Sequence, residues 1–514
     1  MLLSHLTPRD RRLFTEFGYG PVTPLPHSLV HEAFEHRART APGTVAAEHE
    51  GARVTYGELN LRADRLAARL VREGVRPGDR VGLFVRRSIP MLVGLLAALK
   101  AGAAYVPQDI GLTPDAQLRH VLRAAGIRVV LTQIRYADRV PPSPGAVRIA
   151  LDQEPDPVST SPTSSACRPR QLTRATRPDD GCYVLFTSGT TGTPNGVTVT
   201  HRNVCNILLT EPGGLGIGPG QRVAQLLNIA FDMAAWEILG ALTHGGTLLI
   251  RGKDIAETAR RADVLIATPT VLSGIDPRTC PRVRTVAVAG EPCPRPLADL
   301  WAATCAFYNC CGPTETTIVN TMRRHSPTAP QLTIGRPTPN NTVYVLDEHR
   351  RPLPIGRTGE MWAGGDCVSA GYLGAPALTR ERYAPDPFLG GGRRMFRTRD
   401  LGRWTAEGEL EHLGRTDDQV KIRGFRVEPD AVSAVLESVP GCRRAVTLRR
   451  DAHSLVSFVC PQEVDAEAAR GAVAAALPYY CVPAAVFPLA TLPETDRGKI
   501  DKGALLRLAE GAAR

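Results

Sequence analysis

Between residues 54 and 107, segments typical of helices alternate with segments typical of strands. An amphipathic helix is predicted within 54–74, where apolar residues recur at helical spacing up to Gly74, a typical stop signal. Short apolar strands at 80–85 and 103–107 flank a mostly apolar helix at 89–102. Strands that alternate with helices in this way favour a parallel α/β architecture.

Beyond this region the pattern changes. Residues 152–178 are rich in Pro, Ser and Thr and are predicted to form an exposed loop, after which the α/β pattern resumes. From 332 to 412, short strands between Gly and Pro turns predict a small antiparallel barrel or sheet. The residues from about 418 onward predict a separate α+β lobe. No period of about 20–50 residues recurs, so a repeat architecture is excluded.

Composition limits the expected location and partners. Hydrophobic residues make up 43% of the chain, no run of about 18 apolar residues occurs, and the start lacks the apolar segment of a secretory signal. We therefore expect a cytoplasmic protein without a membrane segment. The net charge is +11, but its 57 arginines are dispersed, which indicates a solvated basic surface and no nucleic-acid partner. The 12 cysteines show no zinc or CxxC spacing, so most are expected to be small buried side chains.

The strongest local signal is LFTSGTTGTPNG at 185–196, where a strand runs into a loop rich in Gly, Ser and Thr. Glycines let the backbone approach a ligand closely, and backbone N–H and hydroxyl groups donate to phosphate oxygens. The loop is not a Walker A sequence, because GxxxxGK[ST] is absent. The segment predicts a phosphate-binding loop of a different kind, with a flexible turn as the alternative.

This loop resembles the phosphate loop of the adenylate-forming superfamily, and further segments match the core motifs of amino-acid adenylation domains of nonribosomal peptide synthetases. In chain order these are VTYGEL, LKAGAAYVPQD, FDMAAWE, NCCGPTE, GEMWAGG with SAGYL, FRTRD, GRTDDQVKIRGFRVE, LPYYCVP and RGKID. The resemblance implies an N-terminal core at 1–413, built from two α/β subdomains and a small β subdomain. It also implies a hinge at 414–417 and a small, mobile α+β lid at 418–514.

The resemblance also implies a two-step reaction. A carboxylate attacks the α-phosphate of Mg-ATP, giving an acyl-adenylate and pyrophosphate, and the acyl group then passes to a phosphopantetheine thiol on an acceptor protein. Lys499 matches the catalytic lysine, Glu315 the residue that holds Mg²⁺, and Asp417 the hinge. The implied ATP-binding residues are Thr187, Ser188, Gly189, Thr190, Thr191, Gly192, Cys311, Gly312, Thr314, Asp400 and Arg415.

Four residues depart from the family pattern. Asn195 stands where the phosphate loop usually has Lys, and Cys311 stands where an aromatic ring usually stacks on adenine. Arg399 replaces the usual Gly, and Arg497 replaces the usual Asn. Because Lys499, Glu315 and Asp400 are all retained, we expect a working enzyme with weakened affinity for ATP or a need for a helper.

Asp232, in FDMAAWE, matches the residue that pairs with the α-ammonium group of the substrate. A carboxylate among apolar side chains is costly unless it meets a cation, which favours an α-amino acid over a simple acid. The implied pocket wall is apolar or nearly so, and predicts an apolar substrate side chain, branched aliphatic or aromatic: Met233, Trp236, Ile266, Ala287, Ala289, Cys310, Ile318 and Val319.

The final motif lies near Arg514, and no carrier-type attachment serine follows it, so a stand-alone enzyme with a discrete carrier protein acting in trans is expected. The segment 374–388 resembles the region where many such domains dock a small MbtH-like helper protein, with an ordinary surface loop and helix as the alternative. Two other functions stay open. They are an acid–CoA ligase of the same superfamily and a degenerate, non-catalytic domain that binds a partner protein.

Overall fold

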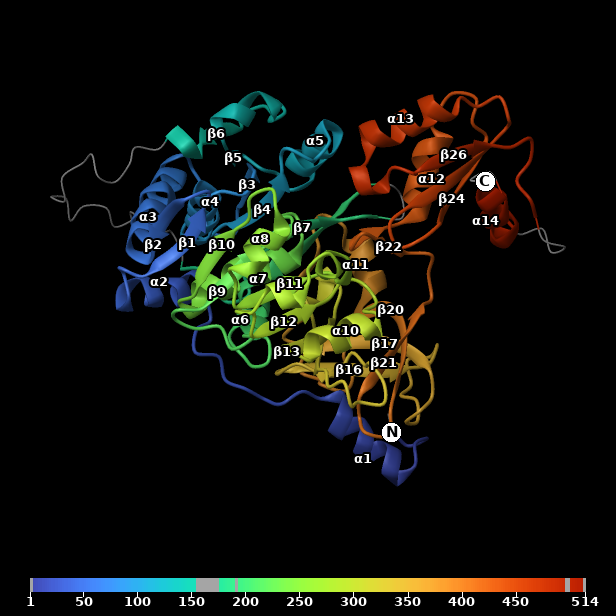
Figure 1. Cartoon of the computed structure of the whole chain (residues 1–514), viewed down its shortest axis with the longest axis horizontal. Helices are drawn as coiled ribbons and strands as arrows, with labels where there is room; N and C mark the ends of the chain where they lie inside the picture. The colour runs from blue at the N-terminus through green and yellow to red at the C-terminus, as the bar shows by residue number, and fades with distance from the viewer. Residues whose placement is uncertain (1–2, 154–174, 190–192, 495–499, 512–514) are drawn as a thin grey trace. The chain divides into compact units, whose positions relative to one another are not determined.

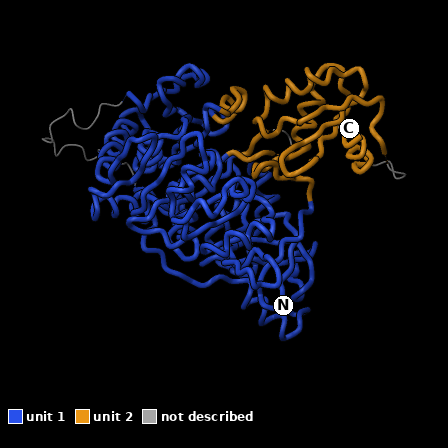
Figure 2. Tube along the Cα trace, viewed as in Figure 1, with its two compact units in different colours: residues 1–111, 122–185, 196–416 blue, residues 112–121, 186–195, 417–514 orange. Residues whose placement is uncertain are grey.

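The computed structural model describes residues 3–153, 175–189, 193–494 and 500–511. Within them the chain forms two compact units (Figure 2). The N-terminal unit comprises residues 1–111, 122–185 and 196–416, and the C-terminal unit comprises 112–121, 186–195 and 417–514. The second unit is thus discontinuous in sequence, because two short segments far upstream group with the last part of the chain.

A mostly parallel nine-stranded sheet forms one half of the N-terminal unit. Its spatial order is β15 (Arg336–Pro337), β14 (Thr321–Arg324), β13 (Ala306–Cys311), β12 (Thr285–Val288), β11 (Val264–Ala267), β9 (Arg222–Gln225), β10 (Thr247–Ile250), β1 (Val45–His49) and β2 (Ala52–Thr55). The six strands from β13 to β1 are parallel, whereas β2, β14 and β15 are antiparallel to their neighbours.

A seven-stranded sheet forms the other half. Its order is β18 (Gly371–Tyr372), β8 (Asn195–Thr200), β7 (Gly181–Thr187), β4 (Ala104–Asp109), β3 (Arg80–Val85), β5 (Val129–Thr132) and β6 (Val147–Ala150). The predicted strand at 80–85 coincides with β3. The strands from β7 to β6 are parallel, and all of them except the edge strand β6 are almost wholly buried, as expected of a sheet covered on both faces.

Helices fill the space between these two sheets (Figure 1). Helix α4 (Ile89–Lys100) packs on β3 and β4, α7 (Asp232–His244) packs on β9, β10 and β11, and α2 (Val30–Thr40) contacts both helices. The predicted helix within 54–74 is α3 (Tyr56–Arg72). Its N-terminus is stabilised by a capping box between Thr55 and Glu58. Other helices of this unit are α1 (Pro8–Gly18), α6 (His201–Leu208), α8 (Ile255–Arg260), α9 (Pro269–Ser273), α10 (Arg295–Ala302) and α11 (Pro376–Arg382).

The predicted small β region is an antiparallel sheet. It consists of β16 (Asn341–Leu346), β17 (Gly359–Gly365), β20 (Arg394–Trp404), β19 (Tyr383–Pro385) and β21 (Leu410–Arg415), which pairs with β20. Alternating burial along β20 shows that one face is packed and the other is partly exposed.

The last hundred residues form an α+β arrangement, as predicted. Its strands are β22 (Val420–Ile422), β23 (Phe425–Val427), β24 (Arg444–Arg449), β25 (Leu455–Cys460) and β26 (Ala485–Pro488), and its helices are α12 (Pro429–Glu437), α13 (Ala466–Ala476) and α14 (Lys502–Gly511). Helix α5 (Asp115–Ala124) begins within this unit. None of the helices in the described ranges is long and apolar enough to span a bilayer.

Candidate active site

Helix α7 begins with Asp232, so this carboxylate lies at the positive end of a 13-residue helix. Phe231, the preceding residue, is extended with φ of −122°, and the helix ends at Gly245, which adopts a left-handed φ of 83°. The carboxylate is only partly buried. The local sequence therefore presents one negative charge at the edge of an otherwise buried helix.

The eight residues predicted to line the substrate pocket all belong to one buried apolar cluster, and none is more than 6% exposed. Strand pairing brings several of them together, since Ile266 on β11 is opposite Ala287 on β12. Ala289 follows Ala287 by two residues, the spacing that places side chains on one face of a strand. The Trp236 indole is fully buried and donates to the carbonyl of Gly213 at 2.8 Å, which fixes the ring.

Tyr183 is a neighbour of Asp232 that the sequence did not reveal. Burial raises the pKa of the Tyr183 phenol well above its ordinary value, and the charge of Asp232 raises it further. Among the described residues the hydroxyl of Tyr183 has no hydrogen-bond partner. Because buried polar groups usually have a hydrogen-bond partner, this hydroxyl is a candidate contact for a polar ligand.

Glu237, the last residue of FDMAAWE, is fully buried and anchors the helix. Its carboxyl group accepts hydrogen bonds from the backbone N–H groups of Leu226 and Leu227, the shorter one at 2.8 Å. Burial raises the pKa of Glu237 to about 8. This contact ties the first half of α7 to the end of β9 and so helps to place Asp232.

The turn that carries Thr314 and Glu315 follows β13 directly. Gly312 permits this turn, because a Cβ at this position would lie 2.6 Å from the Cα of Val319, well inside contact distance. The Glu315 side chain is completely buried. The glycine of NCCGPTE is therefore required by the close approach of two backbone segments.

The next two residues hold an unusual backbone conformation. Thr317 and Ile318 adopt φ angles of 55° and 69°, which β-branched residues rarely do. The Thr317 hydroxyl donates to the carbonyl of Cys367 at 2.8 Å. Strained residues persist where the surroundings fix them, and such residues concentrate at functional sites.

Glu315 receives a hydrogen bond that sequence reasoning missed. The hydroxyl of Tyr372, in SAGYL, donates to Oε1 of Glu315 at 2.6 Å, and both side chains are buried. The backbone N–H of Ser369 donates to the carbonyl of Glu315 at 3.0 Å. The two motifs therefore meet in space although 57 residues separate Glu315 from Tyr372.

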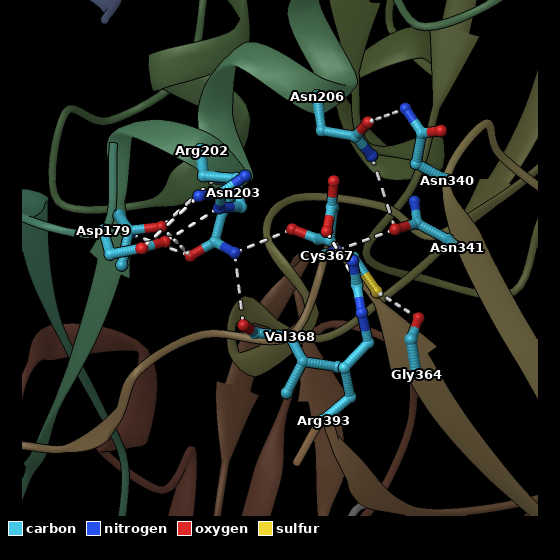
Figure 3. Close-up of polar contacts among 12 residues, drawn as sticks. Asp179, Arg202, Asn203, Asn206, Asn340, Asn341, Gly364, Cys367, Val368 and Arg393 are labelled. Atoms are coloured by element: carbon cyan, nitrogen blue, oxygen red, sulfur yellow. Dashed lines mark hydrogen bonds and ion pairs between the residues drawn. The ribbon is translucent and has the colours of Figure 1, made fainter. Parts of the chain in front are cut away.

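A network of asparagines holds the segment that precedes Tyr372 (Figure 3). Asn203 donates to the carbonyls of Asp366 and Val368 at 2.7 and 3.1 Å. Asn341 accepts from the backbone N–H of Cys367 at 2.7 Å and from Asn206 at 3.3 Å. These bonds link α6, β16 and the loop after β17, and so hold residues 366–368, which precede Tyr372 in the chain.

Asp400 and Arg415, two of the predicted ATP-binding residues, lie on adjacent strands. Asp400 on β20 is the cross-strand partner of Arg415 on β21, and Nη1 of Arg415 donates to Oδ1 of Asp400 at 2.5 Å. His412 Nε2 lies 3.4 Å from the same oxygen. The backbone N–H of Asp400 donates to Thr398 Oγ1 at 3.0 Å, which fixes the carboxylate from the main-chain side. Asp400 is 7% exposed.

The phosphate loop is described in part, within the C-terminal unit. The hydroxyl of Ser188 donates to the carbonyl of Arg426 at 3.1 Å, and that of Thr187 to the carbonyl of Asn195 at 3.5 Å. A Cβ on Gly189 would lie 2.7 Å from Nδ2 of Asn195, so the loop backbone packs on this amide. Thr190, Thr191, Gly192, Arg497 and Lys499 lie outside the described residues.

The structure also describes the surroundings of Cys311 and Arg399, two other residues that differ from the family pattern. Cys311 is partly buried and packs against an apolar cluster that includes Phe17 and Trp404. Arg399 adopts a left-handed φ of 62°, a conformation in which the usual glycine would be unstrained. Asp417, the predicted hinge residue, is the first residue of the last segment of the C-terminal unit.

The fold and these motifs define an adenylate-forming enzyme. Residues 34–373 match the family described as AMP-binding enzyme, so the chain belongs to this family, whose members form adenylates from ATP. The resemblance drawn from the motifs and the predicted α/β fold with a small C-terminal domain are both confirmed.

Relatives of two kinds are similar to the chain. It is 47% identical over 512 residues to Adenylate-forming reductase 03009 of Coprinopsis cinerea, across 99% of this chain and 49% of that protein. It is 37% identical over 500 residues to Phosphinothricin tripeptide synthetase PhsC of Streptomyces viridochromogenes, across 94% of this chain and 45% of that protein. The chain thus spans about half the length of each of these two relatives.

A solved structure is similar over its whole length. PA1221, described as an NRPS protein containing adenylation and PCP domains, matches with a TM-score of 0.81 at 25% identity, covering 97% of this chain and 99% of that chain.

The family implies the use of Mg²⁺ with ATP. Among the residues in the described ranges, no group of three or more His, Cys, Asp or Glu side chains could hold a metal ion. Mg²⁺ that bridges nucleotide phosphates needs only one or two protein carboxylates. The buried, hydrogen-bonded carboxylate of Glu315 fits that requirement.

Proposed function

We propose that this protein activates an apolar α-amino acid as its aminoacyl-adenylate and transfers the aminoacyl group to the phosphopantetheine thiol of a carrier protein. The observation that carries this proposal is Asp232, a single carboxylate at the head of α7 beside a wholly apolar buried cluster. A substrate ammonium group would neutralise that carboxylate, and an apolar side chain would match the cluster.

The nucleotide would be held by groups from three motifs. Asp400 would accept from a ribose hydroxyl, and Arg415 would keep that carboxylate oriented. The hydroxyl of Thr314 would donate to the α-phosphate. Glu315 would hold Mg²⁺, which would neutralise phosphate charge, while Tyr372 keeps the carboxylate aimed. Lys499 would supply the cation that stabilises the charge developing on the reacting carboxylate and phosphate.

The substrate end of the site would use Asp232 and Tyr183. The carboxylate would accept two of the three ammonium N–H groups, and the unpartnered Tyr183 hydroxyl would meet the polar end of the substrate, directly or through water. The small side chains of Ala287 and Ala289 would leave a deep pocket for the substrate side chain, while Met233 and Ile266 would narrow that pocket. A branched aliphatic or aromatic side chain satisfies both conditions.

Residues 1–413 would act as the core, 414–417 as the hinge and 418–514 as a lid that delivers Lys499. A small number of residues around Asp417 could absorb such a rotation. The segment 374–388, which contains α11, is the proposed docking region for an MbtH-like helper protein. Truncation after residue 414 should leave a folded core that adenylates poorly.

The test is amino-acid-dependent exchange between ATP and labelled pyrophosphate, across the proteinogenic amino acids, with and without an MbtH-like protein. Each active amino acid is compared with its deamino acid. Exchange confined to a few apolar amino acids, and lost with the deamino acids, is the expected result. Exchange that is equal for the deamino acids would contradict the role of Asp232. Thioester formation with free coenzyme A would instead support the acid–CoA ligase alternative.

A second candidate concerns the fate of the acyl group. Identity to an adenylate-forming reductase is 47% across 99% of the chain, which exceeds the 37% identity to the peptide synthetase. The thioester would then be reduced by hydride from a nicotinamide cofactor, releasing an aldehyde and the free thiol. Incubation of the loaded carrier with a partner reductase and NADPH distinguishes the two fates, because only reduction yields aldehyde.

A further inference from the structure

Arg399 adopts a conformation that an arginine rarely takes. Its φ of 62° lies in the left-handed region, where glycine is unstrained and a residue with a Cβ is not. It lies within β20, between Thr398 and Asp400. An arginine retained in this conformation points to a contact that glycine could not make.

The side chain of Arg399 makes such a contact with helix α11. Its Nη2 donates to Oε1 of Glu381 at 2.8 Å, and only 24% of the Arg399 side chain is exposed. The same helix is tied to β20 a second time, because Nη2 of Arg382 donates to the carbonyl of Arg397 at 2.9 Å. The Arg382 guanidinium also lies 5.1 Å from the ring centre of Phe396.

The main chain of Arg399 contacts the end of the N-terminal unit. Its carbonyl accepts from the backbone N–H of Thr416 at 2.9 Å and from the Thr416 hydroxyl at 3.3 Å. Thr416 is the last residue of that unit, next to the predicted hinge residue Asp417. The left-handed φ aims this carbonyl at Thr416, while Asp400, the next residue, pairs with Arg415.

We propose that Arg399 is a positioning residue that ties α11 to the hinge end of the N-terminal unit and to the Asp400–Arg415 pair. In this arrangement the Glu381 ion pair holds residue 399 in its left-handed conformation. That conformation in turn fixes both Thr416 and the carboxylate of Asp400. Both the Glu381 ion pair and the Arg382 hydrogen bond connect α11 to β20, and of these two contacts the ion pair is the one made by residue 399 itself. The nucleotide part of this inference rests on the proposed function.

The test uses four variants of the full chain: R399G, E381Q, the double variant R399G/E381Q and the charge exchange R399E/E381R. The first readout is amide hydrogen exchange of a peptide covering 414–416. The second is KM for ATP in pyrophosphate exchange. We expect each single variant to speed amide exchange and raise KM for ATP about three- to tenfold, with kcat changed less than about twofold. The double variant should match the larger single effect, and the charge exchange should recover part of it.

The control is E360Q, which removes another ion pair of β20. Glu360 Oε1 accepts from Nε of Arg397 at 2.9 Å, an ion pair of the same sheet that involves neither Arg399 nor Thr416. This variant should leave both readouts unchanged. Additive effects in R399G/E381Q, unchanged amide exchange at 414–416, or equal effects of E360Q would each overturn the proposal.

The amide-exchange readout needs no substrate, so it separates this inference from the proposed function. If no amino acid supports pyrophosphate exchange, binding of ATP measured by calorimetry replaces KM. Faster amide exchange together with weaker ATP binding would then support the positioning role of Arg399, although the proposed function had failed. Unchanged amide exchange would overturn the positioning role of Arg399, whichever substrate the enzyme activates.

Discussion

Replacing Tyr372 by Phe removes one hydroxyl and leaves the ring in place. In the structure that hydroxyl donates to Glu315 Oε1 at 2.6 Å, and the acceptor is completely buried. A hydrogen bond to a charged group contributes about 1.5–3 kcal/mol, and about 1.4 kcal/mol corresponds to a factor of ten. If Glu315 holds Mg²⁺, the half-saturating Mg²⁺ concentration should therefore rise about 10- to 100-fold, as is typical when a group that orients a metal ligand is lost.

The assay is pyrophosphate exchange at saturating amino acid over a range of Mg²⁺ concentrations. The matched control is Tyr344→Phe, which removes a buried hydroxyl that donates to the Asp386 carboxylate at 3.2 Å in the antiparallel sheet. Both variants should lose some stability in urea, and the loss for Tyr344→Phe should be the smaller because its bond is longer. Only Tyr372→Phe should change the Mg²⁺ requirement. An unchanged Mg²⁺ requirement in a folded Tyr372→Phe protein would refute the role of Glu315.

Four further outcomes are expected. Gly312→Ala should lower stability by several kcal/mol in urea unfolding, because the new Cβ would lie 2.6 Å from backbone. Burial lowers the pKa of His31 to about 4 and that of His201 to about 3, so below pH 6.5 the unfolded chain binds protons that the native state does not. Stability should then fall by roughly 2 kcal/mol per histidine between pH 6.5 and 5 and continue to fall toward pH 3, and His31→Gln should flatten a urea-midpoint profile over this range. Asp400→Asn should raise KM at least about tenfold for ATP but little for 2′,3′-dideoxy-ATP, which lacks the hydroxyls. Lys499→Ala should lower the exchange rate by about 10²-fold or more, whereas a rate close to that of the parent would contradict the catalytic role of Lys499.

Local sequence patterns predicted much of the fold. The strand at 80–85 is β3, and the helix predicted within 54–74 is α3, because apolar periodicity, a capping box and a stopping glycine all agree there. The discontinuity of the C-terminal unit was not predictable in this way. Two upstream segments, 112–121 and 186–195, belong to that unit because they contact distant parts of the chain. Hydrophobic periodicity does not predict such long-range contacts.

The candidate site was predictable to the level of motifs but not of contacts. The motif SAGYL is recognisable in the sequence, but nothing local connects its tyrosine, Tyr372, with Glu315. The same holds for Glu237 in FDMAAWE, whose hydrogen bonds to Leu226 and Leu227 depend on the packing of α7 against the end of β9. The left-handed conformation of Arg399 could not be predicted either. The sequence shows that arginine replaces the usual glycine, but it does not show which φ the arginine adopts.

The departures from the family pattern bear on whether this is a working enzyme. Each one that the structure describes is accommodated by specific contacts: Asn195 beneath the backbone of Gly189, Cys311 against an apolar cluster, and Arg399 on Glu381. Glu315 is completely buried and accepts a hydrogen bond from the Tyr372 hydroxyl, so a carboxylate is held in place at the position predicted to bind Mg²⁺. Under the proposed function this arrangement favours catalysis, and Asn195 and Cys311 are the departures expected to weaken phosphate and adenine affinity. A helper that acts on α11 would then compensate through Arg399, which among the described departures is the one that adds a contact between the nucleotide site and the surface.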